Sequence, residues 1–368
     1  MKIVVLSSHT PSLFWFRMDM MQSFKNKGHE VYAVGNEDES VWREQFLEKG
    51  IKYYQIEVQR NGINPVSDLK TICSIKKVLK TICPDKVFVF QAKTVIYGGI
   101  AARMLGIKEI YPLIAGVGSV FLGKGIKNQI VRKILVLEYR IAMKKSAVVF
   151  FQNKDDEKLF RDNKIVHNQK VVKLNGSGVN LDNFKVQPLP EKFGFLCISR
   201  LIRDKGVYEY LEACEKVKEQ YPLVKFMLVG PYDSNPSALK KEELTPFIDK
   251  GIIEYYGEQK DVRPYLEKCN VFVLPSYREG TPKTVLEAMA CGRAIITTDA
   301  PGCKETVIDG QNGFLIPVKN VEALCEKMIY FIEHPEEIDK MGVEGRKRTE
   351  ELFDVNIVNE VICASMSI

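Results

Sequence analysis

The stretch "VFVLPSYREGTPKTVLEAMACGRAIITT", residues 271–298, contains the local order that decides the fold. VFVLPS (271–276) is an apolar run of strand length, and YREG (277–280) has the composition of a turn. KTVLEAMAC (283–291) follows as a helix, and AIITT (294–298) is a second β-rich run. A strand, a helix and a strand in this order predict a βαβ unit with parallel strands.

The same rhythm runs through the whole chain. In the first half the β-rich runs are KIVVL (2–6), EVYAV (30–34), KVFVF (86–90), EIYPLI (109–114) and AVVFF (147–151). After a charged, proline-containing segment the runs resume with FLCIS (195–199), KFMLVG (225–230) and IIEYYG (252–257). We therefore expect an α/β protein with two Rossmann-like domains, residues 1–187 and 188–368. The last part is helical, with a break at His334-Pro335 and helices that can pack back on the first domain.

Composition favours a globular protein and excludes several classes. The 45% hydrophobic content contains no uncharged run near the roughly 20 residues that span a bilayer. MKIVVLSSHTPS (1–12) reads as a first strand and not as a signal peptide, so we expect a cytoplasmic protein. The nine cysteines show no C-x-x-C pair and are interpreted as reduced core residues.

Charge is distributed unevenly between the two halves. Residues 1–187 hold 30 Lys and Arg against 17 Asp and Glu, a net +13, whereas residues 188–368 hold 23 against 30, a net −7. The basic residues lack interleaved aromatics and no nucleic-acid-binding motif is present, so nucleic acid is not an expected partner.

The start of the helix after YREG has the features of an anion site. Thr281 and Pro282 are expected at the N-cap and N1 positions, so the first free amides, at Lys283 and Thr284, carry the positive end of the helix dipole. Such an end suits a diphosphate, and Glu287 lies one turn further along the helix. In a purely structural alternative, Glu279 compensates the helix dipole, and Glu287 forms an ion pair with Lys283 on a solvated face of the same helix.

Residues 270–318 resemble the nucleotide-sugar signature of the retaining family 4 glycosyltransferases, which have the GT-B fold. The matching residues are Pro275-Ser276, Glu279-Gly280, Glu287-Ala288-Met289-Ala290, Gly292, Gly302, Glu305 and Gly310-x-x-Gly313. ISRLIRDKG (198–206), YYGEQKDV (255–262) and NGSGVNLDNF (175–184) are similar to further motifs of that family. In the third motif, Asn180 stands where the family usually has Asp.

The resemblance implies two Rossmann-like domains facing a central cleft, a nucleotide-sugar donor on the second domain and an acceptor on the first. Arg200 and Lys205 would grip the donor diphosphate, Glu279 would meet sugar hydroxyls, and these three are the candidate catalytic residues. Further candidate donor-binding residues are Gly257, Glu258, Gly280, Thr281, Pro282, Lys283, Thr284 and Glu287, the last of which would hold the ribose. No D-x-D motif is present, so no metal and no cofactor are expected, and a UDP-sugar would be a co-substrate. Retention would follow from front-face attack, with the donor phosphate accepting the acceptor proton.

Candidate acceptor or sugar contacts lie in loops of the first domain. His9 and Arg17 follow the first strand, where His9 alternatively is only a turn residue. Gly116 and Gly118 lie where the commoner family pattern has a histidine, and glycine lets backbone approach a sugar closely.

The variant around residues 114–121 resembles transferases that extend polyprenyl-diphosphate-linked sugars, including those adding N-acetylgalactosamine. A lipid-linked acceptor and a role in capsule, O-antigen or related glycan assembly are therefore expected. Residues 123–151 place seven cations around an apolar helix, which predicts either peripheral contact with the inner face of an anionic membrane or an ordinary basic outer face.

Three other functions compete with this hypothesis. A UDP-N-acetylglucosamine 2-epimerase uses the same fold without a separate acceptor. A non-catalytic relative would bind the nucleotide-sugar and release no nucleotide. A dinucleotide-dependent dehydrogenase is disfavoured, because LSSHTPS (6–12) and SRLIRDKG (199–206) lack G-x-G-x-x-G.

Overall fold

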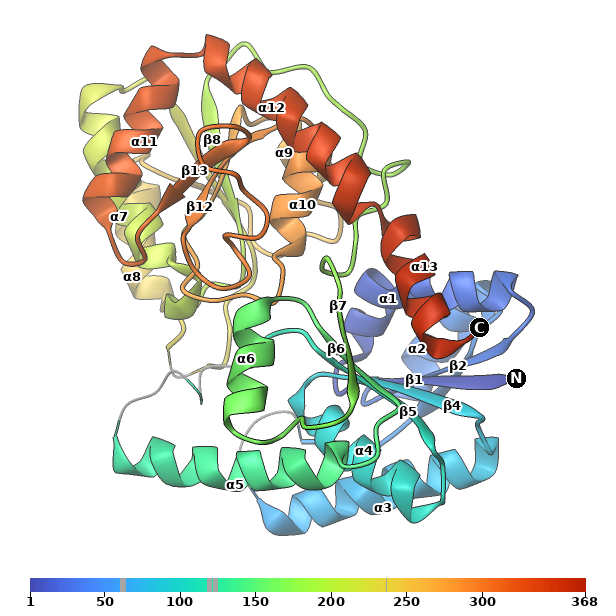
Figure 1. Ribbon diagram of the computed structural model, residues 1–368. Coiled ribbons are helices and arrows are strands. Elements are labelled where there is room, and N and C mark those ends of the chain that lie inside the picture. Colours follow the sequence, from blue (N-terminus) through green and yellow to red (C-terminus); the bar gives the residue numbers. More distant parts are fainter. Residues whose placement is uncertain (60–63, 118–120, 122–124, 236) are drawn as a thin grey trace. The chain divides into compact units, whose positions relative to one another are not determined.

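The β-rich runs form two parallel sheets, as the sequence predicts. In the computed structural model, which describes residues 1–59, 64–117, 121, 125–235 and 237–368, the chain divides into two compact units (Figure 1). Unit 1 comprises Met1–Ser177 and Val355–Ile368, and unit 2 comprises Gly178–Asp354. The sequence-based division is between residues 187 and 188.

Unit 1 is built on a sheet with strand order β3-β2-β1-β4-β5-β6-β7, in which every pairing between described strands is parallel. The strands are β1 (Lys2–Leu6), β2 (Glu30–Gly35), β3 (Lys52–Gln55), β4 (Lys86–Phe90), β5 (Glu109–Ile114), β6 (Val148–Phe151) and β7 (Lys170–Lys173). The helices are α1 (Thr10–Asn26), α2 (Glu39–Glu48), α3 (Pro65–Ile82), α4 (Ala92–Met104), α5 (Ile126–Met143), α6 (Lys154–Asp162) and α13 (Val355–Met366).

Successive side chains of β1 point to opposite faces of the sheet, and each face has its own hydrophobic core in unit 1. Val4 and Leu6 point into a cluster with α3, α4, α5 and α6, whereas Ile3 and Val5 point into a cluster with α1, α2 and α13. Buried residues of α13, including Ile362 and Met366, thereby join the chain's last helix to its first (Figure 1).

Unit 2 repeats the design with strand order β10-β9-β8-β11-β12-β13. Its strands are β8 (Gly194–Ile198), β9 (Lys225–Val229), β10 (Glu254–Tyr255), β11 (Val271–Leu274), β12 (Ala294–Thr298) and β13 (Gly313–Ile316). Its helical segments are the short 3₁₀ turn η2 (Arg203–Lys205), α7 (Val207–Gln220), α8 (Lys241–Asp249), α9 (Arg263–Leu266), α10 (Lys283–Ala290), α11 (Val321–Glu333), α12 (Glu336–Arg348) and the π-helical turn η3 (Thr349–Phe353). One sheet face packs against α7, α8, α11 and α12, and the other against α9 and α10.

The structure tests two local predictions, a helix break and the burial of the cysteines. The break at His334-Pro335 is confirmed, because α11 ends at Glu333 and α12 begins at Glu336. The cysteines are free, but Cys73 and Cys83 on α3 and its end are exposed, so the expectation that all nine lie in the core is wrong. A cysteine at an exposed position meets no packing demand, so burial is not required there.

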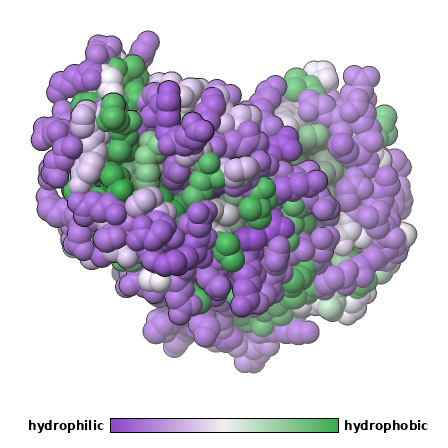
Figure 2. Space-filling model, turned by 90° about the horizontal axis from the view of Figure 1, so that it is seen from above, coloured by the Kyte–Doolittle hydropathy of each residue, from purple (hydrophilic) through white to green (hydrophobic). Residues whose placement is uncertain are grey.

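The surface is predominantly hydrophilic on the face drawn in Figure 2, where hydrophobic residues appear in small groups. Scattered apolar groups of this kind are normal on folded proteins. No helix within the described ranges is long and apolar enough to cross a membrane.

Candidate functional site

The strand order of unit 2 reverses between β8 and β11. From β8 the chain moves outward to β9 and β10, and from β11 it moves in the other direction to β12 and β13. Open α/β sheets bind ligands beside the carboxyl ends of the strands at such a reversal. The loops that follow β8 and β11 contain Arg200, Lys205 and Glu279, so the three candidate catalytic residues share this place.

Lys205 and Glu279 form an ion pair across the reversal. Lys205 Nζ donates to Glu279 Oε1, and the two side chains are only 19% and 13% exposed. Lys205 closes the short helix η2, and Glu279 lies between β11 and α10. The structure therefore brings together a cation and a carboxylate that are 74 residues apart in the sequence.

Arg200 is paired with a residue that the sequence analysis did not single out. Its Nη1 donates to Asp233 Oδ2 at 2.9 Å, and the Asp233 side chain is largely buried whereas that of Arg200 is about half exposed. Asp233 lies four residues after β9, so its place in the loop behind a predicted strand was the only sequence signal that could have found it.

Backbone contacts hold the two loops against each other. Tyr277 N–H donates to Asp204 O at 2.9 Å, and the hydroxyl of Ser276 donates to the same oxygen at 3.1 Å. The Tyr277 hydroxyl donates to Glu209 Oε1 on α7 at 2.5 Å. Because these contacts fix the loop after β8 to the loop after β11, the positions of Lys205 and Glu279 are set by rigid neighbours.

Helix α10 begins at Lys283, as the run KTVLEAMAC predicts, but its N-cap lies one residue later than expected. Its N-cap is Pro282, without a side-chain capping bond, so the expectation of Thr281 at the N-cap and Pro282 at N1 is wrong. The register shifts because the amides of Val285 and Leu286 already donate to Pro282 O. The amides of Lys283 and Thr284 consequently still form the first turn, at the positive end of the helix dipole.

Glu287 lies on the buried face of α10. Its carboxylate is 3.9 Å from Lys283 Nζ, and its side chain is about 10% exposed. Burial raises the pKa of Glu287 to about 7; Lys283 acts to lower the pKa and Asp261 acts to raise it. The solvated-face alternative is wrong for this residue, because the carboxyl group is buried.

Gly257 and Glu258 follow β10, on the same edge of the sheet. Gly257 has a φ of +68°, and its carbonyl accepts a 2.8 Å hydrogen bond from the amide of Gly230 after β9. Gly230 in turn packs against the backbone of Ser199, just before Arg200, where an added Cβ would lie 1.8 Å from Ser199 O. Glu258 is exposed. The loops after β8, β9 and β10 are thus in contact.

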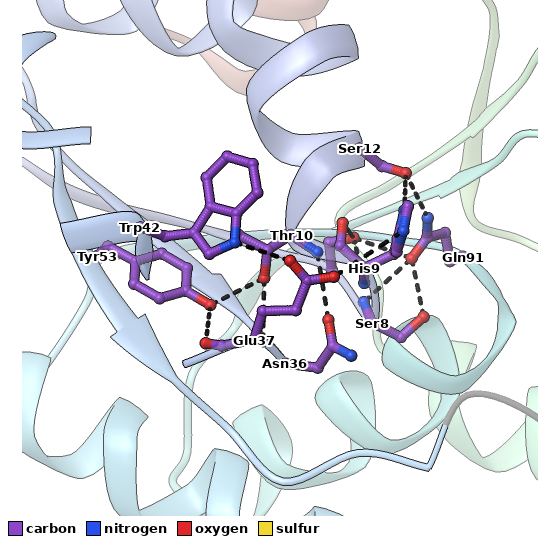
Figure 3. A network of polar contacts seen from close by, with 10 residues as sticks. Ser8, His9, Thr10, Ser12, Asn36, Glu37, Trp42, Tyr53 and Gln91 are labelled. Atoms are coloured by element: carbon purple, nitrogen blue, oxygen red, sulfur yellow. Dashed lines mark hydrogen bonds and ion pairs between the residues drawn. The ribbon is translucent and has the colours of Figure 1, made fainter. Parts of the chain in front are cut away.

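Unit 1 has an equivalent reversal between β1 and β4, and a polar network occupies it (Figure 3). His9 is the N-cap residue of α1, and its Nδ1 lies 2.8 Å from Ser12 Oγ while its Nε2 lies 4.0 Å from Glu37 Oε1. Gln91, directly after β4, accepts bonds from Ser7 and Ser8. The turn-residue alternative for His9 is compatible with these contacts.

Gln91 and Glu37 were missed by the sequence analysis. Gln91 has a φ of +71°, a conformation that non-glycine residues adopt at an energetic cost and mostly at functional sites. Glu37 follows β2 and accepts a 2.7 Å hydrogen bond from the Trp42 indole. Gln91 directly follows β4 and Glu37 lies two residues after β2, so a polar residue close behind a strand was the available signal.

Three further residues of the first domain are candidate acceptor or sugar contacts. Arg17 lies on the buried face of α1, with its guanidinium over the Phe90 ring. Gly116 follows β5 with a φ of +106°. Gly118 lies outside the described residues.

The described part of the chain contains no cluster of three or more His, Cys, Asp or Glu side chains arranged to hold a metal ion. Arg200, Lys205 and the start of α10 contribute positive charge at the reversal in unit 2.

Solved structures share this architecture along the whole chain. Sucrose-phosphate synthase from Thermosynechococcus elongatus has a TM-score of 0.81 at 16% identity, covering 99% of this chain and 97% of that one. Anabaena HepE in complex with UDP has a TM-score of 0.78 at 16% identity and full coverage of both chains. The fold is therefore GT-B, as the resemblance implied.

Sequence comparisons define the family. Residues 2–153 match the model "Glycosyl transferase 4-like", and residues 192–334 match "Glycosyl transferases group 1". An N,N'-diacetylbacillosaminyl-diphospho-undecaprenol alpha-1,3-N-acetylgalactosaminyltransferase of Campylobacter jejuni is 30% identical over 347 residues, covering 90% of each chain. A UDP-Gal:alpha-D-GlcNAc-diphosphoundecaprenol alpha-1,3-galactosyltransferase of Escherichia coli is 25% identical, covering 77% of this chain and 76% of its own. The chain belongs to the family 4 retaining glycosyltransferases.

Proposed function

We propose that this glycosyltransferase moves an N-acetylhexosamine or hexose from a UDP-sugar to a sugar carried on a polyprenyl diphosphate, with retention of configuration. The observation that carries the proposal is the clustering of Arg200, Lys205, Glu279 and buried Glu287 at the strand reversal of unit 2. The 30% identity to the Campylobacter enzyme supports the choice of acceptor.

The donor would lie beside the carboxyl ends of β8 and β11. Arg200 and Lys205 would exchange their carboxylate partners for the diphosphate, and the amides of Lys283 and Thr284 would donate to it. A hydrogen bond to a charged group contributes about 1.5–3 kcal/mol, so two cations and a helix start can stabilise the departing UDP without a metal. Glu279, released from Lys205, would accept from sugar hydroxyls, and Glu287 from the ribose.

The remaining donor contacts follow from the same placement. Gly257 and Glu258 would border the base, and the Gly280–Pro282 loop would lie against the sugar.

In the reaction the bond between the sugar C1 and the phosphate oxygen breaks, and the acceptor hydroxyl oxygen bonds to C1 on the same face. The hydroxyl proton passes to the departing phosphate. The acceptor would contact His9 and Arg17, with Gly116 lining its approach.

The surface of α5 supports peripheral contact with an anionic membrane at the inner face of the cytoplasmic membrane. Ile130, Ile134, Leu137 and Ile141 are 43–57% exposed and recur at intervals of three and four residues, so they lie on one helix face. Exposed cations accompany them at Lys133, Arg140, Lys144 and Lys145. A hollow of about 450 Å³ beside the helix is lined in part by Arg132, Lys133 and Arg140. Apolar residues beside cations suit an anionic lipid surface.

Vesicle co-sedimentation tests this contact. Leu137→Glu with Ile141→Glu should abolish binding to phosphatidylglycerol vesicles, because carboxylates would enter the apolar face. Lys144→Glu with Lys145→Glu should weaken it most at low salt. Leu223→Glu, at a position 92% exposed in unit 2, is the matched control and should bind like the unchanged protein. Unaltered binding by both double variants would remove α5 from the contact.

Transfer itself is tested with purified protein, UDP-N-acetylgalactosamine or another UDP-sugar, and a polyprenyl-diphosphate-linked sugar in EDTA. We expect UDP release that depends on the lipid acceptor and a product with the donor's anomeric configuration. Conversion of UDP-N-acetylglucosamine without acceptor would instead indicate an epimerase. Nucleotide-sugar binding without UDP release would indicate a non-catalytic relative.

A further inference from the structure

Arg17 of α1 is a buried cation for which the described residues supply no acidic partner. The residue is 3% exposed, and its guanidinium carbon lies 5.0 Å from the centroid of the Phe90 ring. Nε has no hydrogen-bond partner, and no ion pair joins Arg17 to a carboxylate of the described residues. Burial lowers the pKa of Arg17 to about 10, so the group is still charged at neutral pH.

This arrangement is unfavourable unless something else is bound. Arginine is almost never fully buried unless it is paired, because desolvation of a charge is costly. Stacking on an aromatic ring offsets only part of that cost. An anionic ligand beside the guanidinium would supply the missing partner.

The place of Arg17 is where such a ligand would be expected. Phe90 is the last residue of β4, and α1 follows β1, so the guanidinium lies at the strand reversal of unit 1. Side chains on a helix lean toward its N-terminus, which directs Arg17 toward the first turns of α1. His9, Ser12 and Gln91 form a polar network at the same end (Figure 3).

Two anions take part in the proposed reaction. The donor diphosphate already has Arg200, Lys205 and the start of α10 on unit 2. An acceptor sugar carried on a polyprenyl diphosphate brings a second diphosphate, and unit 1 offers a desolvated cation that lacks an acidic partner among the described residues. We propose that Arg17 binds a phosphate of the acceptor diphosphate. This inference rests on the proposed function for the identity of the anion.

Thermal unfolding of Arg17→Met and of the unchanged protein tests the anion site. Met keeps much of the side-chain length without the charge, so the ligand-free variant should unfold at a higher temperature. With UDP present at saturation to occupy unit 2, added inorganic diphosphate should stabilise the unchanged protein and leave Arg17→Met unaffected. Arg161→Met, which removes a partly exposed arginine of α6 paired with Glu157, is the control and should respond to diphosphate like the unchanged protein.

Steady-state kinetics then identify the anion. Arg17→Met should raise the KM for the lipid-linked acceptor about ten- to a hundredfold, the equivalent of one charge-assisted bond, and leave the KM for the UDP-sugar unchanged. A variant that is less stable and keeps both KM values would show a purely structural arginine and overturn the proposal. A raised KM for the UDP-sugar alone would assign Arg17 to the donor and also overturn it.

The outcomes separate the two hypotheses. If the protein transfers no sugar but diphosphate still stabilises it through Arg17, the proposed function fails and an anion site remains, with free diphosphate as its ligand. If transfer occurs and diphosphate stabilises Arg17→Met as it does the unchanged protein, the proposed function stands and the Arg17 site is disproved.

Discussion

At the scale of single residues, the cations proposed to bind the donor are paired with carboxylates. Lys205 is paired with Glu279, and Arg200 with Asp233. Under the proposed function, each carboxylate would keep its cation in place until a diphosphate replaces it. The sequence motif identified Arg200, Lys205 and Glu279, but not their pairing, because contacts between residues far apart in the chain depend on the strand order.

Lys205→Met should lower kcat/KM for the UDP-sugar, with a loss of about 2–5 kcal/mol in transition-state stabilisation. The substitution removes a proposed phosphate contact and also removes the cation that pairs with the buried Glu279 carboxylate. Lys216→Met removes an exposed pair with Glu322 and serves as the control, with no expected change. Steady-state kinetics of the two variants provide the measurement. Normal kinetics in Lys205→Met would remove this lysine from the donor site.

Glu287 should make stability depend on pH. Its pKa is about 7 in the folded protein against an ordinary value of 4.5, so the folded state binds more protons between these values. The free energy of unfolding should therefore fall as pH rises from about 4.5 to 7, by on the order of 3 kcal/mol from this group. Above pH 7 and below pH 4.5 the contribution is constant.

Urea unfolding at pH 5, 6, 7 and 8 measures this effect as the difference between the unchanged protein and Glu287→Gln, which cannot titrate. UDP affinity of the unchanged protein should rise through pH 7, because the ionised carboxylate is the better acceptor for ribose hydroxyls. Parallel pH profiles of stability for the two proteins would contradict the raised pKa.

At the scale of elements, close backbone packing positions the loops of unit 2. Gly206 follows Lys205 with a φ of +70°, and an added Cβ would lie 2.0 Å from Pro275 O at the end of β11. Gly206→Ala should therefore separate the loops after β8 and β11, lower the melting temperature and reduce kcat/KM at least about tenfold.

Gly251→Ala is the matched control for this effect. Gly251 has a φ of +66° but no atom within 4 Å of an added Cβ, so it carries the same backbone strain without the clash. Calorimetry and kinetics should show a small loss of stability and normal activity for Gly251→Ala. Equal effects of the two substitutions would show that strain, and not loop packing, determines the result.

The central strands were predictable from the sequence, whereas three of the four edge strands were not. KVFVF and AIITT appear in the structure with the expected bounds, because each is an apolar run buried on both faces of a parallel sheet. The strands that the sequence analysis missed are β3, β7 and β13, and all three lie at sheet edges. Their sequences KYYQ, KVVK and GFLI are four residues long and partly exposed, so they carry a weak apolar signal.

At the scale of the whole molecule, the chain crosses between its units at two places. The proline-containing segment suggested a linker near residues 185–193, but Arg293 Nη1 and Nη2 donate to Gln187 O and Pro188 O at 2.9 and 3.0 Å. These bonds attach the segment to unit 2, whose first residue is Gly178. Helix α13 belongs to unit 1 because its apolar face joins the core of α1. A buried arginine that binds backbone carbonyls leaves no sequence pattern, so these bonds were not predictable.

Thermal unfolding in EDTA with UDP, GDP or NAD tests the central claim most directly. A ligand at 100 times its dissociation constant adds about 2.7 kcal/mol to the free energy of unfolding. The account predicts that UDP stabilises the protein without metal, that Lys205→Met loses much of this effect, and that NAD has none. Stabilisation by NAD alone, or by UDP only after a divalent metal is restored, would contradict a metal-independent UDP-sugar site at the strand reversal of unit 2.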